Sequence, residues 1–172
     1  MKLPIQEHVD DSVFAAIDLV IATASASHFA MSVQLLRILN PQGGMRGSLN
    51  PMVITLGMKI DTVLGLLKTL VRLNAPKIAD EFDTAADALR TSFTKKRDVL
   101  AHNAFGMVKG KRDRILAYRI KTVGKLEWTN HALTETEMRK WAAEIHTQAT
   151  KIDDLLTTAG FPPWKEWRAS FG

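Results

Sequence analysis

The feature that most constrains the fold is an unbroken helical repeat of apolar residues near the start of the chain. Between Asp11 and Leu39, these residues recur at steps of three and four, the spacing that places side chains on one side of an α-helix. The stripe consists of Val13, Ile17, Val20, Ala24, His28, Met31, Leu35 and Ile38. The most apolar part of this segment is short for a membrane span and contains Asp18. We therefore predict a long core helix and no membrane insertion.

A second helix is expected to begin at Asn50, a residue type that caps helices well, with Pro51 in the first helical position. Gly57 and Gly65 lower the helix propensity of this segment, so we expect close packing against another helix there. Its stripe consists of Val53, Leu56, Ile60, Leu64, Leu67 and Val71.

A third helix is expected to begin near Pro76. Its apolar stripe stops before Lys96, so we expect its last turns to face something other than the core. The stripe consists of Ile78, Phe82, Ala85, Leu89 and Phe93.

The pattern then changes to alternation, which predicts a β-hairpin over about residues 114–129. Thr134 and Glu137 have the spacing of a capping box, and Gly160 suits the end of the helix that follows. The predicted fold is mainly α: an antiparallel bundle of about four long helices, with one β-hairpin inserted before the last helix. We expect one domain over residues 1–160. Residues 161–172 form an aromatic tail (Trp164, Trp167 and Phe171) that packs on the body or on a partner.

Charge is concentrated in residues 95–125, which contain ten Lys or Arg and two acidic residues, a segment charge of +8. Because the whole chain carries +5, the remainder carries −3. Such a local positive field attracts polyanions, although a solvated hairpin would show the same composition. We expect contacts with the RNA backbone from Lys95, Lys96, Lys109, Lys111, Arg112 and Arg114.

Several chemistries lack the residues they need. The chain has no cysteine, which excludes disulfides and thiolate metal sites and fits a cytoplasmic location. No two of the five histidines have metal-ligand spacing, and no phosphate-binding glycine loop or nucleophile elbow is present. We therefore expect no metal and no cofactor.

The stretch "RDVLAHNAFG", residues 97–106, combines Arg97, Asp98 and His102 at the end of the third helix. Histidine can transfer protons near neutral pH, and arginine can stabilise charge on a phosphate. Asp98 lies four residues before His102, on the same helix face, and could orient the imidazole. Arg97 and His102, however, are about 140° apart around a regular helix. Either the helix unwinds near Asn103, or a symmetric partner supplies the second residue, which we favour.

This stretch resembles the signature of HEPN domains (higher eukaryotes and prokaryotes nucleotide-binding), in which Arg, a polar residue and His lie on the last long helix of a bundle. The resemblance implies a metal-independent endoribonuclease, toxin-like or defence-related, with Arg97, Asp98 and His102 in a dimeric site. It also implies RNA as substrate, a homodimer, and an antitoxin or regulatory protein as a further partner. Some members of the family are non-catalytic modules that bind nucleic acid, nucleotide or protein. A purely structural dimer with ordinary surface charges is the third alternative.

Overall fold

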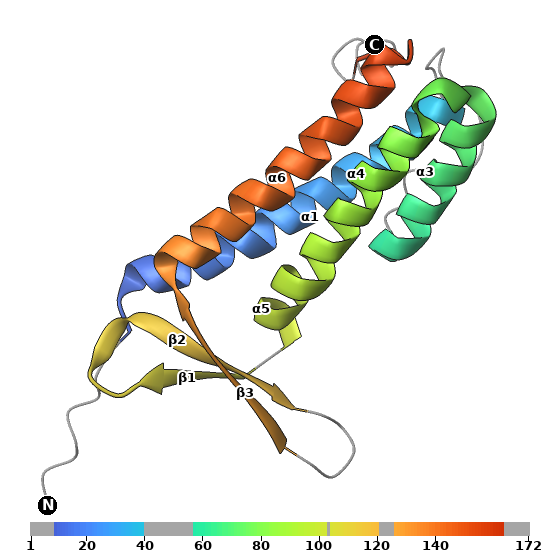
Figure 1. The fold of residues 1–172 in the computed structure, drawn as a ribbon. Helices are drawn as coiled ribbons and strands as arrows, with labels where there is room; N and C mark the ends of the chain where they lie inside the picture. Colours follow the sequence, from blue (N-terminus) through green and yellow to red (C-terminus); the bar gives the residue numbers. More distant parts are fainter. Residues whose placement is uncertain (1–8, 40–56, 103, 121–125, 164–172) are drawn as a thin grey trace, which may run out of the picture. The chain divides into compact units, whose positions relative to one another are not determined.

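A computed structural model describes residues 9–39, 57–102, 104–120 and 126–163 of the chain (Figure 1). The protein is mainly helical, with a three-stranded antiparallel sheet before the last helix, which confirms the predicted fold class. It divides into two compact units. The single domain over residues 1–160 stays a prediction. The sheet unit comprises Met1–Ala24 and Ser92–Glu144, and the helical unit comprises Ser25–Thr91 and Ile145–Gly172. Helices α1 (Asp11–Leu39) and α6 (Glu135–Thr158) each contribute to both units.

The helical unit contains the hairpin of α3 (Ile60–Asn74) and α4 (Ala79–Ser92), joined through the short 3-10 turn η1 (Pro76–Ile78). Asn50, the predicted start of the second helix, lies outside the described residues. The prediction of a continuous helix from Asn50 is nevertheless wrong, because residues 57–59 are not helical and Lys59 has an extended backbone. Close packing at Gly65 is also wrong, since a Cβ atom built there would meet nothing within 4 Å.

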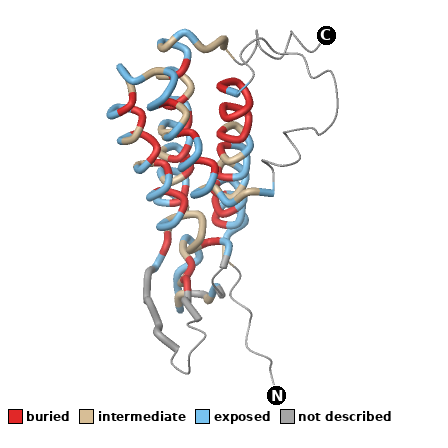
Figure 2. The backbone as a smooth tube through the Cα atoms, turned by 90° about the vertical axis from the view of Figure 1, so that its right-hand side faces the viewer, coloured by how far each residue is buried: buried red, intermediate tan, exposed pale blue. Residues whose placement is uncertain are grey.

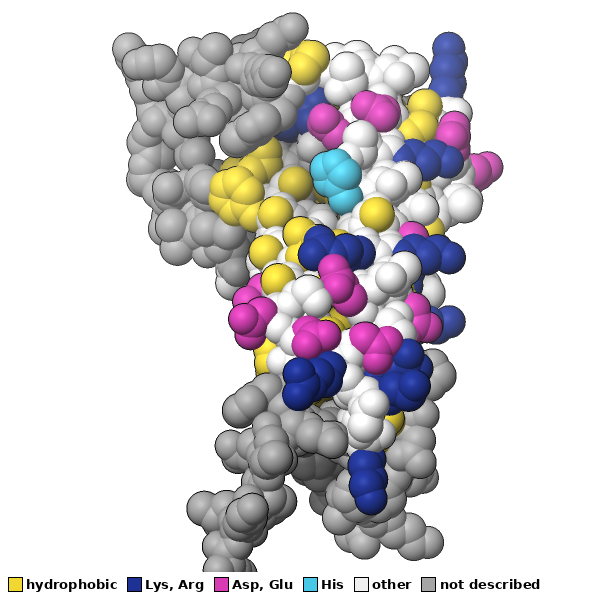
Figure 3. All heavy atoms as spheres, turned by 90° about the vertical axis from the view of Figure 1, so that its left-hand side faces the viewer, with side chains coloured by type: hydrophobic (Ala, Val, Ile, Leu, Met, Phe, Trp, Pro, Cys, Tyr) yellow, Lys and Arg dark blue, Asp and Glu magenta, His cyan; other side chains and the backbone are white. Residues whose placement is uncertain are grey.

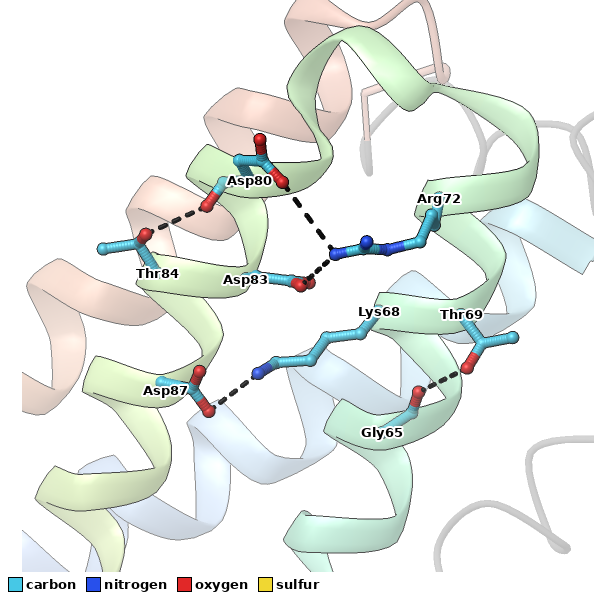
Figure 4. A network of polar contacts seen from close by, with 8 residues as sticks. All are labelled: Gly65, Lys68, Thr69, Arg72, Asp80, Asp83, Thr84 and Asp87. Carbon is cyan, nitrogen blue, oxygen red and sulfur yellow. Dashed lines mark hydrogen bonds and ion pairs between the residues drawn. The ribbon is translucent and has the colours of Figure 1, made fainter.

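Ion pairs join α3 to α4 along the outside of this hairpin (Figure 4). Lys68 Nζ lies 2.7 Å from Asp87 Oδ1, and Arg72 Nη2 lies 2.6 Å from Asp83 Oδ2. Exposed pairs of this kind each contribute about 0–1 kcal/mol, so apolar packing is the main source of stability. Figure 2 shows buried residues recurring along the helices. The larger side chains of this core include Met31, Leu35, Leu64, Leu67, Val71, Phe82, Leu89, Ile145, Ile152 and Leu156.

A buried arginine links α1 to α6 inside the helical unit. Arg37 is 0% exposed, and its Nη1 donates to Gln34 Oε1 and to Asp153 Oδ1. Gln34 Nε2 donates to the same Asp153 oxygen at 2.8 Å. Because a buried charge is costly unless it is paired, removing Asp153 would strongly destabilise this unit.

The sheet unit contains strands β1 (Ala104–Val108), β2 (Lys111–Ile120) and β3 (Leu126–Thr134), in that order across the sheet. The predicted hairpin corresponds to β2 and β3, which are longer than expected. The predicted hairpin lacks β1: Ala104–Val108 pairs antiparallel with β2, and Gly106 lies opposite Leu116. Gly110, with φ +72°, allows the chain to turn between β1 and β2.

The sheet buries Ile115, Ala117 and Leu133, which with Val13, Phe93 and Met138 belong to the apolar core of this unit. Leu116, on the other face, is only half-buried. The pairing register shifts between Ala117 and Arg119, so alternation along β2 is not continuous.

Helix α6 begins and ends at the predicted signals. The backbone N–H of Thr134 donates to Glu137 Oε2 at 3.0 Å, and the N–H of Glu137 donates to Thr134 Oγ1 at 3.3 Å, which confirms the capping box. At the other end, Gly160 has φ +93° and the N–H of Phe161 donates to the carbonyl of Leu156 at 3.1 Å. The tail residues Trp164, Trp167 and Phe171 lie outside the described residues.

Candidate nucleic-acid site

The third long helix changes its winding just before the candidate site. After α4, residues Phe93–Arg97 form a π-helical turn, η2, and Asp98–His102 form the α-helical segment α5. The backbone N–H of Asp98 donates to the carbonyl of Phe93, five residues earlier. Single π turns inside α-helices are rare and occur frequently at functional sites. The sequence pattern gave no sign of this turn, which ends at Arg97.

Arg97 and Asp98 form an ion pair on the surface of the sheet unit. Arg97 Nη1 donates to Asp98 Oδ1 at 2.9 Å, and the two side chains are 33% and 44% exposed. That Asp98 orients His102 stays a prediction. The side chain of His102 lies outside the described residues, although its backbone is the last residue of α5.

The backbone of α5 fixes the positions of the motif residues around the helix axis. Because α5 is helical from Asp98 through His102, Asp98 and His102 share a helix face. Arg97 and His102 remain about 140° apart around the axis, as in a regular helix. The position at which we allowed for unwinding, Asn103, lies outside the described residues. A site shared between two chains therefore stays a prediction.

The predicted RNA-binding residues fall into two groups. Arg114 Nη2 lies 2.6 Å from Asp113 Oδ2, which raises the pKa of Arg114 and lowers that of Asp113, and Lys96 forms an ion pair with Glu144. The other predicted residues are exposed and have no ion pair within the described part of the chain: Lys95, Lys109, Lys111 and Arg112.

On the face shown in Figure 3, the Lys and Arg side chains of the described residues are interspersed with Asp and Glu. We therefore take the cations without ion pairs, and not a uniform basic patch, as the candidates for anion binding.

No family model, curated protein or solved structure matches the chain. Any proposal about its function is therefore argued from its own residues. Within the ranges that the structure describes, no group of three or more His, Asp or Glu side chains is placed to hold a metal ion.

Helix α1 is the one described helix that is long and apolar enough to cross a membrane, with a mean hydropathy of 1.6 over its best 18-residue window. Length and composition alone are weak evidence, since core helices meet the same criteria. Val13, Ile17 and Val20 of this helix are buried within the sheet unit, as the core-helix prediction requires. The cytoplasmic location stays a prediction.

Proposed function

We propose that the chain is a metal-independent endoribonuclease of the HEPN type, toxin-like or defence-related, that acts as a homodimer in the cytoplasm. The observation that carries this proposal is the position of the Arg97–Asp98 pair, which lies where a π turn meets the short helix that ends at His102. Arg97 ends the π turn and His102 ends the helix that follows it, in a segment that also carries the exposed Lys95.

The proposed reaction uses the ribose 2′-OH of the substrate as nucleophile. One His102 imidazole accepts the proton of the 2′-OH while the oxygen attacks the adjacent phosphorus. The bond from phosphorus to the 5′-oxygen breaks, and a protonated imidazole donates a proton to that oxygen. Arg97 stabilises the extra negative charge on the phosphoryl oxygens in the transition state. The products are a 2′,3′-cyclic phosphate and a 5′-hydroxyl.

A homodimer is part of the proposal because Arg97 and His102 lie about 140° apart around a regular helix. A two-fold axis beside α5 would place two arginines and two histidines around one cleft. Phe14 and Phe105 of the sheet unit are 51% and 40% exposed, and large apolar side chains of this kind are enriched at protein interfaces. An antitoxin or regulatory protein is a further partner that we propose from the family resemblance alone.

A second candidate is a non-catalytic module of the same fold that binds nucleic acid, nucleotide or a partner protein. The ion pair between Arg97 and Asp98 favours this alternative, because a guanidinium already paired with a carboxylate is less available to a phosphate. His102 then lies at a helix C-terminus, where a cationic side chain interacts favourably with the helix dipole.

The deciding experiment incubates the purified protein with labelled single-stranded RNA in excess EDTA. The wild type should cut RNA and spare the all-DNA version, which lacks the 2′-OH. His102→Ala should abolish cutting with an unchanged circular dichroism spectrum, whereas His146→Ala, which alters an exposed histidine of α6, should cut normally. No cutting by the wild type, or full cutting by His102→Ala, would rule out the nuclease.

A further inference from the structure

A lysine outside the predicted basic segment lies next to the candidate site. Lys140 is an exposed residue of α6 and belongs to the same compact unit as η2 and α5. Within the described ranges it has no ion pair. No motif marks it, and only the fold brings it near the Arg97 region.

The contact between η2 and α6 is an ion pair of Lys96 with Glu144. Lys140 precedes Glu144 by one helical turn, so both side chains lie on the side of α6 that faces η2. The side chain of Lys96 is 17% exposed. Burial, and then the positive charge of Lys140, lower the pKa of Lys96. Lys140 is thus near enough for its charge to act on Lys96, and Glu144 is the ion-pair partner of Lys96 alone.

This arrangement leaves the exposed Lys140 without an ion pair in the described ranges, near the partly buried Lys96. The neighbouring Arg97 is paired with Asp98. Two like charges held close together are destabilising, and more so where water is partly excluded. A bound anion would remove this repulsion. The anion must also reach Lys96, which Glu144 already contacts, so the carboxylate and the anion compete for one ammonium group.

We propose that Lys96 and Lys140 together bind one phosphodiester group of a single-stranded RNA, and that this phosphate displaces Glu144 from Lys96. The proposal rests on the proposed function for the identity of the polyanion. Glu144 is then a competitor of the substrate: in the RNA-free protein it occupies the lysine that the phosphate binds. Lys140 binds the strand beside Arg97 and takes no part in the chemical step.

The experiment measures fluorescence anisotropy of a labelled single-stranded RNA in which every 2′-OH is methylated, so that it cannot be cut by 2′-OH attack. The loss of one phosphate contact should lower the salt slope by about 0.7, which corresponds to about eightfold weaker binding near 50 mM salt in Lys140→Ala. Lys140→Glu should bind more weakly still. Lys77→Ala, which removes an exposed lysine of η1, should bind as the wild type does.

Glu144→Gln should bind the same RNA about two- to fivefold more tightly, because the competing carboxylate is gone while its shape remains. The matched control is Glu81→Gln, which neutralises the partner of Lys151 in another Lys–Glu pair of the protein. If Glu144 has a purely structural role, Glu144→Gln will lower thermal stability and leave RNA affinity unchanged or weaker. That result would rule out competition between Glu144 and the RNA phosphate for Lys96.

The same data separate this inference from the nuclease proposal. Binding that depends on Lys140 without any cutting of unmodified RNA would support the phosphate site and contradict the nuclease. Cutting of unmodified RNA with binding unaffected by either Lys140 variant would overturn the phosphate site alone. The absence of RNA binding by the wild type would overturn both.

Discussion

Arg97 and Asp98, adjacent in the chain, form an ion pair with 2.9 Å between Nη1 and Oδ1. Both side chains are partly exposed, so the pair contributes little to the free energy of unfolding. Its consequence is local: the carboxylate holds the guanidinium in one direction and offsets its charge. A phosphate that approaches Arg97 must therefore compete with Asp98, and a reaction at Arg97 benefits from the fixed orientation.

Asp98→Asn is expected to separate these two effects. RNA affinity should rise about two- to fivefold because the phosphate no longer competes with a charged group. Cleavage should fall at least about tenfold because Arg97 loses its fixed orientation. Anisotropy with 2′-O-methylated RNA measures the affinity, and single-turnover cutting of unmodified RNA measures the rate.

The control for this variant is Asp113→Asn, which neutralises the partner of Arg114 in the other ion pair between neighbouring residues of the basic segment. It should raise affinity without slowing cleavage. Equal cleavage by Asp98→Asn and the wild type would show that Asp98 has no part in positioning Arg97.

Mixing two inactive variants tests whether the site is shared between subunits. Arg97→Ala and His102→Ala should each be inactive alone. Half of the randomly paired dimers keep one arginine and one histidine of the shared cleft, on different subunits, and these dimers should regain part of the wild-type rate. Cutting is measured after the variants are refolded together, with separately refolded samples as the control. A mixture that stays inactive argues for a site within one chain.

The capping box of α6 predicts a stability change that is independent of function. Thr134→Ala removes the hydroxyl that accepts the Glu137 N–H, and we expect a loss of about 0.5–2 kcal/mol in the free energy of unfolding. Urea denaturation followed by circular dichroism measures this loss. Thr136→Ala is the matched control, because Thr136 is an exposed threonine in the first turn and not the cap. Equal losses in both variants would contradict a capping role.

Glu135 predicts how stability changes in acid. Hydrogen bonds from Arg139 and then Ser12 lower the pKa of Glu135 below its usual 4.5. A carboxylate with a lowered pKa in the folded state stabilises the protein above the unfolded value and loses this contribution as the pH falls through the folded value. Glu135→Gln should therefore lower the urea midpoint at pH 7, and the difference from the wild type should shrink near about pH 3.

Two further variants check the origin of this acid effect. Arg139→Gln removes the main partner of Glu135. Its urea midpoint should also lie below that of the wild type at pH 7, and this difference should also shrink in acid. Thr150→Ala alters an exposed residue of the same helix that has no charge and should keep the wild-type pH profile. A Glu135→Gln midpoint that stays equally lowered at both pH values would contradict the pKa argument.

Local order in the amino-acid sequence was enough to predict most of the helices. The bounds of α1, Asp11–Leu39, follow from its apolar spacing, and the start and stop of α6 follow from Thr134 and Gly160. These features can be predicted from the sequence because helix hydrogen bonds and caps join residues only three to five positions apart. The same locality identified Arg97, Asp98 and His102 as one cluster on one helix end.

Contacts between residues far apart in the chain decided the rest. Strand β1 exists because β2 pairs with it, and its own short segment has a weak pattern. The ion pairs of Arg37 with Asp153 and of Lys96 with Glu144 each join separate helical elements. Which cations are neutralised, and that the charge of Lys140 acts on Lys96, therefore depend on tertiary packing, because electrostatic interactions are set by distance in space and not by position along the chain.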